Sequence, residues 1–133
     1  MIPSFDESGL LPPGVHAATL AEIAARFGSA SELRRVQMES IRWMVETAAR
    51  AGVRRIVLNG SFTTDTMEPN DVDCVLLFIA GLPRDRPAMD ALHDGLPFLD
   101  MKLVGQEDFD EFVGFMFATD RAGVPKGMIE VIL

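Results

Sequence analysis

The spacing of apolar residues along the chain alternates between a helical and a strand-like pattern, which is typical of a mixed α/β fold. Apolar residues recur at intervals of three and four, and so predict helices, over residues 17–27, 32–51, 88–93 and 107–118. Short apolar runs bounded by Gly, Pro or Asp predict strands over residues 53–58, 71–80, 98–104 and 128–133. The fold class expected from this order is α/β (α+β), with a small mixed β-sheet of about four strands flanked by helices.

The first two helices carry recognisable end signals. Thr19 and Glu22 have the spacing of a capping box, and Gly28 ends the helix that they begin. Gly52 follows the second helix at the position where a left-handed glycine commonly ends a helix. Residues 1–16, in contrast, show no periodicity and contain three prolines, so we expect an extended N-terminal arm there.

The stretch between the first two predicted strands combines a Gly-Ser turn with a pair of carboxylates. Gly60-Ser61 ends one apolar run, and Asp71 and Asp73 open the next. Because residues two apart in a strand point to the same side, both carboxylates should project together beside the turn. Neighbouring carboxylates repel, and Mg²⁺ relieves this repulsion because it prefers carboxylate oxygens and substrate phosphates as ligands. The alternative interpretation is an ordinary turn and cap after Pro69, with no metal.

Glycine and serine suit a phosphate site beside these carboxylates. Gly60 would let the backbone approach a phosphate closely, and Ser61 offers both an N–H and a hydroxyl group. Two Mg²⁺ ions about 3.5–4 Å apart would suit in-line transfer of a nucleotidyl group.

These residues resemble a known signature. Gly60-Ser61 followed by Asp71-Val72-Asp73 resembles the Gly-Ser…Asp-x-Asp signature of the DNA polymerase β-type nucleotidyltransferase superfamily. The fuller pattern is similar to a family of small bacterial nucleotidyltransferase-like proteins, and it comprises residues 11–16, 60–64, 69–73 and 126–130. The likeness spans nearly the whole chain and implies a minimal nucleotidyltransferase-like arrangement.

The resemblance implies roles for individual residues. Asp71 and Asp73 would hold Mg²⁺, and a third carboxylate on the neighbouring strand matches Asp100. Asp100 would act as a general base on the acceptor hydroxyl or as a further metal ligand; the alternative is a surface residue of a half-exposed strand. The strand of Asp100 is expected to run antiparallel to its neighbour. Contacts to the triphosphate would come from Gly60, Ser61, Thr64 and Lys102.

The function implied is that of a Mg²⁺-dependent nucleotidyltransferase, which would move a nucleoside monophosphate from a nucleoside triphosphate to a hydroxyl group on a protein or an RNA. A lysine is common near position 66 in the related family, whereas this chain has Thr66. The alternative is therefore a catalytically degenerate binding protein with the same fold, such as a toxin–antitoxin component. The phenylalanine-rich helix over residues 107–118 would suit a protein partner, and a homodimer is a further alternative. A third hypothesis for the function is a structural metal-binding domain.

Length and charge narrow these alternatives. The chain has 133 residues, which favours a single domain over residues 1–133. Its formal net charge of −8 argues against broad non-specific binding of nucleic acid, which depends on Lys and Arg contacts to phosphate. Six arginines fall within one short region, and we expect most of them on the solvated face of a helix: Arg34, Arg35, Arg42, Arg50, Arg54 and Arg55.

Cysteine usage and hydropathy favour the cytoplasm. The single cysteine, Cys74, cannot form an internal disulfide and fits a reducing compartment. It is expected to be buried on the strand face opposite Asp71 and Asp73. The longest apolar run, residues 75–80, is far shorter than the about 20 residues needed to cross a bilayer. The acidic N-terminus does not resemble a signal peptide, so we expect a cytoplasmic protein with no membrane contact.

Overall fold

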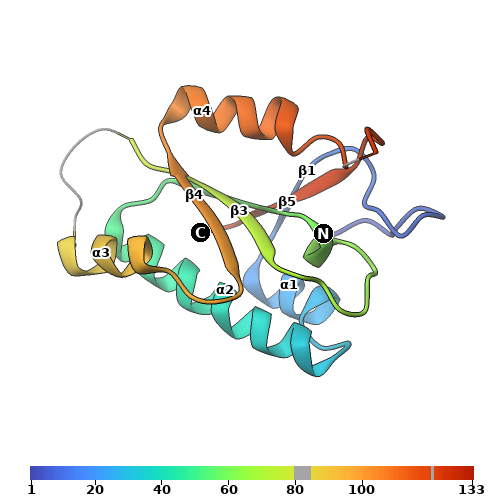
Figure 1. Ribbon diagram of the computed structural model, residues 1–133, viewed down its shortest axis with the longest axis horizontal. Helices are drawn as coiled ribbons and strands as arrows, with labels where there is room; N and C mark the ends of the chain where they lie inside the picture. The colour runs from blue at the N-terminus through green and yellow to red at the C-terminus, as the bar shows by residue number, and fades with distance from the viewer. Residues whose placement is uncertain (80–84, 121) are drawn as a thin grey trace.

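The computed structural model describes residues 1–79, 85–120 and 122–133, and a mixed five-stranded sheet forms its centre (Figure 1). The strands are β1 (Gly14–Ala18), β2 (Arg55–Asn59), β3 (Val72–Leu77), β4 (Leu99–Val104) and β5 (Gly127–Val131). Their order across the sheet is β1-β5-β2-β3-β4. The central strand β2 runs antiparallel to β3 and β5, whereas the pairs β1·β5 and β3·β4 are parallel. The α+β class is confirmed, with five strands instead of about four.

Helices cover both faces of this sheet (Figure 1). They are α1 (Leu20–Phe27), α2 (Glu32–Ala51), α3 (Arg86–Asp94) and α4 (Gln106–Glu111), which continues as a π-helical turn over Phe112–Met116. The first three helices lie on one face, and α4 lies on the other. Alternate residues of each strand therefore enter two separate apolar clusters: Leu58 and Cys74 pack toward α2, and Val57 and Val75 pack toward α4.

The helix ends follow from local sequence signals. Thr19 and Glu22 form the expected capping box at the start of α1, because each side chain accepts a hydrogen bond from the other's backbone N–H. Ser31 caps α2 in the same way by accepting from the N–H of Arg34 at 3.1 Å. Gly52 ends α2 with φ of 91°, a left-handed conformation that glycine adopts without steric cost.

The N-terminal segment differs from the extended arm expected over residues 1–16. Gly14–Ala18 forms β1, which pairs in register with β5, and α1 starts at Leu20 instead of residue 17. The preceding residues are fixed to the body: Arg26 donates a hydrogen bond to the carbonyl of Pro3 at 2.9 Å and lies over the ring of Phe5. Because β1 is a half-exposed edge strand, it lacks the apolar alternation by which strands are recognised.

The direction of β4 is a second correction. It was expected to be antiparallel to its neighbour, but it runs parallel to β3. The helix α3 connects the two strands and returns the chain to the end at which β3 began, so β4 must run the same way. This parallel register places Asp73 beside Asp100. Within the residues described, no helix combines the length and the apolar character needed to cross a membrane.

Candidate functional site

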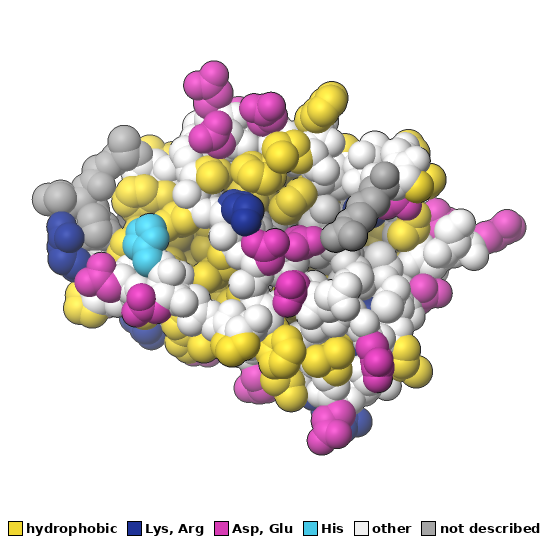
Figure 2. All heavy atoms as spheres, viewed as in Figure 1, with side chains coloured by type: hydrophobic (Ala, Val, Ile, Leu, Met, Phe, Trp, Pro, Cys, Tyr) yellow, Lys and Arg dark blue, Asp and Glu magenta, His cyan; other side chains and the backbone are white. Residues whose placement is uncertain are grey.

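A cavity of about 660 Å³ lies on the α4 side of the sheet, where β2 ends and β3 begins. Its lining brings together five carboxylates, the Gly-Ser turn and one lysine. Acidic side chains gather near the middle of the surface view, next to a basic side chain (Figure 2). The lining residues used below are Asn59, Gly60, Ser61, Thr64, Asp71, Asp73, Asp100 and Lys126.

Asp73 and Asp100 form the carboxylate pair of this cavity. They are direct partners in the β3·β4 register, so their side chains point to the same face. Burial raises the pKa of Asp73, and the nearby charge of Asp100 raises it further. Asp71 lies just before β3 and raises the same pKa slightly, whereas Lys126 lowers it. The cavity thus concentrates negative charge that only one nearby lysine offsets among the groups acting on Asp73.

The Gly-Ser turn packs directly against Asp73. Gly60 has φ of 80°, and a Cβ atom at this position would collide with the Asp73 carboxylate. Only glycine therefore allows the backbone to pass so close to the acid. Ser61 begins a short 3₁₀ turn, Ser61–Thr63, and its Oγ accepts a hydrogen bond from the N–H of Asn70 at 3.3 Å. This hydrogen bond ties the start of the loop, at Ser61, to its end, at Asn70.

A buried arginine holds the rest of this loop. Arg34 of α2 donates hydrogen bonds to the carbonyl oxygens of Phe62, Thr64 and Thr66 at 2.6–3.0 Å. Its exposed fraction is 3%, so the expectation of a solvated face is wrong for Arg34. One helical turn later, Gln37 donates to the carbonyl of Pro69 at 2.8 Å. The first half of α2 therefore turns polar side chains inward, because the loop backbone needs donors.

Among the cavity residues that had no role predicted from the sequence, two are buried polar side chains, Lys126 and Asn59. Lys126 is only 7% exposed, and within the described part of the chain its ammonium group forms no ion pair. Burial lowers the pKa of Lys126, while Asp73 and Asp120 act in the opposite direction. Asn59 lies opposite Asp73 in the β2·β3 register, and its buried Oδ1 has no hydrogen-bond partner among the described residues. Both side chains are thus available to a bound molecule.

The remaining predicted site residues differ in their surroundings. Thr64 lines the cavity, but its hydroxyl already donates to the carbonyl of Ser61 at 2.7 Å. Lys102 lies outside the cavity lining and pairs with Asp100, with 2.8 Å between Nζ and Oδ1. This hydrogen bond raises the pKa of Lys102. Cys74 is fully buried on the opposite face, where burial raises its pKa.

The donor set suits a hard cation that is shared with a ligand. In the described ranges, no group of three or more His, Cys, Asp or Glu side chains forms a ready-made metal cage. Mg²⁺ is usually held by only one or two carboxylates together with substrate phosphates and waters. Asp73 and Asp100, with Asp71 and the unpartnered oxygen of Asn59 nearby, supply oxygens of this kind. The residues present therefore fit Mg²⁺ bound together with a nucleotide.

Comparison with known families gives one match. A family model described as a family of unknown function, DUF6932, matches residues 3–132. Comparisons with curated proteins and with solved structures give no match.

Proposed function

The chain belongs to the DUF6932 family, whose function is unknown. From the site, together with the resemblance of its residues to the nucleotidyltransferase signature, we propose that the protein is a Mg²⁺-dependent nucleotidyltransferase. The reaction would move a nucleoside monophosphate from a nucleoside triphosphate to a hydroxyl group on a protein or an RNA. The single, buried Cys74 supports a cytoplasmic setting.

The observation that supports this proposal best is the concentration of carboxylates in the cavity. Asp71, Asp73 and Asp100 line one cavity, and the pKa of Asp73 is raised because burial and Asp100 both disfavour its ionised form. A perturbed carboxylate in a cavity is a common mark of a functional site. A divalent cation would remove the repulsion, and a nucleotide would fill the remaining coordination positions.

The protein's own residues would divide the work as follows. Asp71 and Asp73 would hold Mg²⁺, which supplies charge neutralisation at the phosphates when it is bound. The backbone of Gly60 and Ser61 would approach the triphosphate, because no side chain at position 60 separates it from the cavity. The ammonium group of Lys126 would contact a phosphate oxygen and so replace the lysine that Thr66 does not provide.

Asp100 would act as the general base for the acceptor hydroxyl. Its carboxylate would accept the proton of the acceptor hydroxyl, whose oxygen then bonds to the α-phosphorus while pyrophosphate leaves. Lys102 holds Asp100 from outside the cavity at 2.8 Å, which fixes the orientation of the carboxylate. Positioning the two reactants beside each other would be the main contribution of the site.

A degenerate binding protein, such as a toxin–antitoxin component, is the second candidate. The observation in its favour is the exposed apolar surface after α4, where Phe115 and Met116 are 76% and 55% exposed. Large exposed apolar side chains often mark a surface that binds another protein. This candidate needs neither a nucleotide nor Mg²⁺.

Titration calorimetry with each nucleoside triphosphate in Mg²⁺ separates the two candidates. We expect binding by the wild-type protein and none by the double variant Asp71→Ala/Asp73→Ala. The control is Asp108→Ala/Asp110→Ala, which removes two exposed carboxylates at the same spacing on α4 and should bind normally. Absence of heat with all nucleotides, or equal binding by both double variants, would overturn the proposal and favour the binding protein.

A further inference from the structure

The strand β4 ends the sheet, and its outer side has no strand partner in the described part of the chain. Two hydrogen bonds fix the direction of its backbone groups: Val72 N–H donates to Phe98 O at 2.9 Å, and Phe78 N–H donates to Val104 O at 2.8 Å. Because backbone groups alternate sides along a strand, the even-numbered residues of β4 bond to β3. Met101 and Leu103 therefore direct both N–H and C=O outward, and Leu99 directs its C=O outward.

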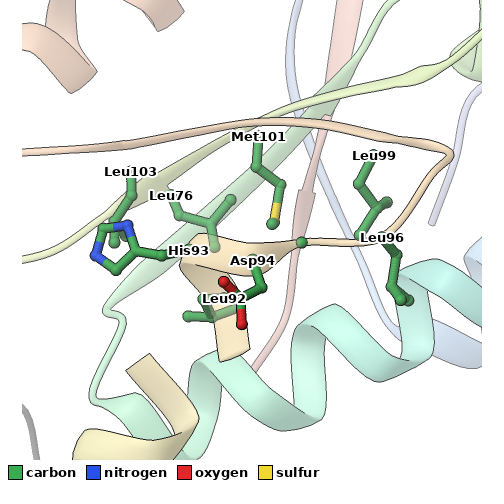
Figure 3. Close-up of a pocket in the computed structure, with 9 residues that line it drawn as sticks. Leu76, Leu92, His93, Asp94, Leu96, Leu99, Met101 and Leu103 are labelled. Carbon is green, nitrogen blue, oxygen red and sulfur yellow. The ribbon is translucent and has the colours of Figure 1, made fainter. Parts of the chain in front are cut away.

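The side chains of β4 separate into a charged face and an apolar face. Asp100 and Lys102 lie on the α4 side, and their side chains are 48% and 51% exposed. Leu99, Met101 and Leu103 lie on the other side and are only half-buried. They form one wall of an open groove of about 290 Å³, whose other wall comes from α3 and the turn after it (Figure 3). An edge strand with such a flank is prone to pair with another strand.

We propose that β4 pairs antiparallel with β4 of a second copy of this chain, about a twofold axis through Met101. This inference is independent of nucleotide binding. In an antiparallel pair, two directly opposed residues either exchange hydrogen bonds with each other or both face away. The outward-facing residues must therefore oppose one another. The twofold axis then lies midway between one residue and its own copy, and we name each register by that residue, as in an axis through Met101.

Among the three registers centred on Asp100, Met101 or Lys102, near the middle of β4, the charges select one. An axis through Asp100 would place this carboxylate opposite its own copy, and an axis through Lys102 would do the same for two ammonium groups. Like charges directly opposite one another destabilise a strand pair. An axis through Met101 instead places each Asp100 opposite Lys102 of the partner subunit. The existing Asp100–Lys102 pair would then become part of a network of four alternating charges.

The apolar face is self-complementary in the same register. Leu99 lies opposite Leu103 of the partner subunit, and Met101 lies opposite its own copy. Their outward backbone groups face each other, so the two edges would satisfy one another's hydrogen bonds. The open groove beside α3 would be extended by the same apolar side chains from the second copy. The pairing also brings Lys102 of the partner subunit to the rim of the candidate active site at Asp100.

Charge exchange provides the test, with sedimentation equilibrium as the measurement and circular dichroism to verify folding. We expect the wild-type chain to form a dimer. The variants Asp100→Lys and Lys102→Asp each create two like-charge pairs, so each should weaken dimerisation on the order of tenfold or more. The double variant Asp100→Lys/Lys102→Asp should restore it. An equimolar mixture of the two single variants should form a heterodimer, since all its cross-strand pairs are again opposite in charge.

Three results would overturn the proposal. One is a wild-type chain that remains monomeric at every concentration examined. Another is a dimer whose dissociation constant is unchanged in both single variants, which would place the interface elsewhere. The third is loss of the dimer in the single variants without recovery in either the double variant or the mixture, because the register through Met101 requires both recoveries. Arg35→Glu, a charge reversal on the exposed side of α2, serves as the control and should not alter the dimer.

Discussion

Removal of the Arg34 guanidinium should cost more stability than removal of any other arginine side chain in this chain's α2. Arg34 donates five hydrogen bonds to four carbonyl oxygens, at 2.6–3.0 Å, and is 3% exposed. Four of these bonds hold the loop that carries Ser61 and Thr64, and the fifth reaches the end of α1 at Phe27. The variant Arg34→Met keeps much of the apolar stem but leaves these carbonyls without their donor.

The magnitude follows from the contacts. A hydrogen bond to a charged group contributes about 1.5–3 kcal/mol, so a plain sum over five bonds would equal the whole stability of a domain, about 5–15 kcal/mol. The bonds share one buried charge whose desolvation offsets part of their gain, and the loop can admit water after the change. We therefore expect Arg34→Met to lower the free energy of unfolding by about 3–5 kcal/mol. Arg34→Lys should cost less, about 1–3 kcal/mol, because an ammonium group has three donors and no planar fork.

Urea denaturation followed by circular dichroism measures this difference. The matched control is Arg35→Met, which removes an exposed guanidinium at the next position and should change the free energy of unfolding by no more than about 0.5 kcal/mol. A loss of less than about 1 kcal/mol in Arg34→Met would refute the reasoning, because it would mean that the loop does not depend on the arginine. A loss in Arg35→Met as large as in Arg34→Met would refute it equally.

Three other results are expected. The folded state favours the protonated form of Asp73, so the unfolding free energy should fall as pH rises from about 4 through the raised pKa of this group. Asp73→Asn should remove this fall in urea titrations between acid and neutral pH. A pH profile that is unchanged in this variant would contradict the assignment. Gly60→Ala should cost about 1–3 kcal/mol in thermal unfolding because φ is 80° and the Cβ meets Asp73, whereas Gly114→Ala, which meets no atom within 4 Å, should be tolerated. Lys126→Met should weaken nucleotide affinity in calorimetry roughly tenfold or more, while Lys102→Met should weaken it less because Lys102 lies outside the cavity; the reverse order would contradict the phosphate contact.

The elements that local chemistry determines were predictable from the sequence. The bounds of α2, Glu32–Ala51, follow from the Ser31 cap and from Gly52, and both signals lie next to the helix in the sequence. The faces of β3 followed from simple alternation, which correctly placed Cys74 in the core and Asp73 on the other side. Local signals were sufficient here because no distant segment alters them.

Elements that depend on distant partners were not predictable in the same way. The strand β1 exists because its backbone pairs with β5, more than 100 residues away along the chain, as in Gly14 beside Gly127. Its own residues are half-exposed and carry no apolar alternation. The buried role of Arg34 was missed for a related reason. Most of the arginines in this region were expected on the solvated face of a helix, but the loop beside the first half of α2 presents carbonyl groups and therefore requires donors.

Some residues of the candidate site were predictable from the sequence, and others depend on distant partners. Asp71 and Asp73 were identified from their spacing, and Asp100 from the family likeness, and all three line the cavity. Lys126 and Asn59 reach that cavity only through the order of strands in the sheet, which spacing does not reveal. The signal available for Lys126 was weak: it is one of only two lysines in the chain.

The unfavourable polar burial around the cavity favours a functional site over an ordinary turn. A turn and cap need only satisfied backbone groups, and they give no reason for charged side chains to be buried nearby. Around this one cavity, the pKa of Asp73 is raised, the pKa of Lys126 is lowered by burial, and Asn59 keeps a buried oxygen without a partner. Each feature costs stability by itself, and each would be relieved by a cation and an anionic ligand bound together. Buried polar groups that one bound ligand would satisfy together are expected at a binding site. They therefore support the nucleotide site over the simple turn.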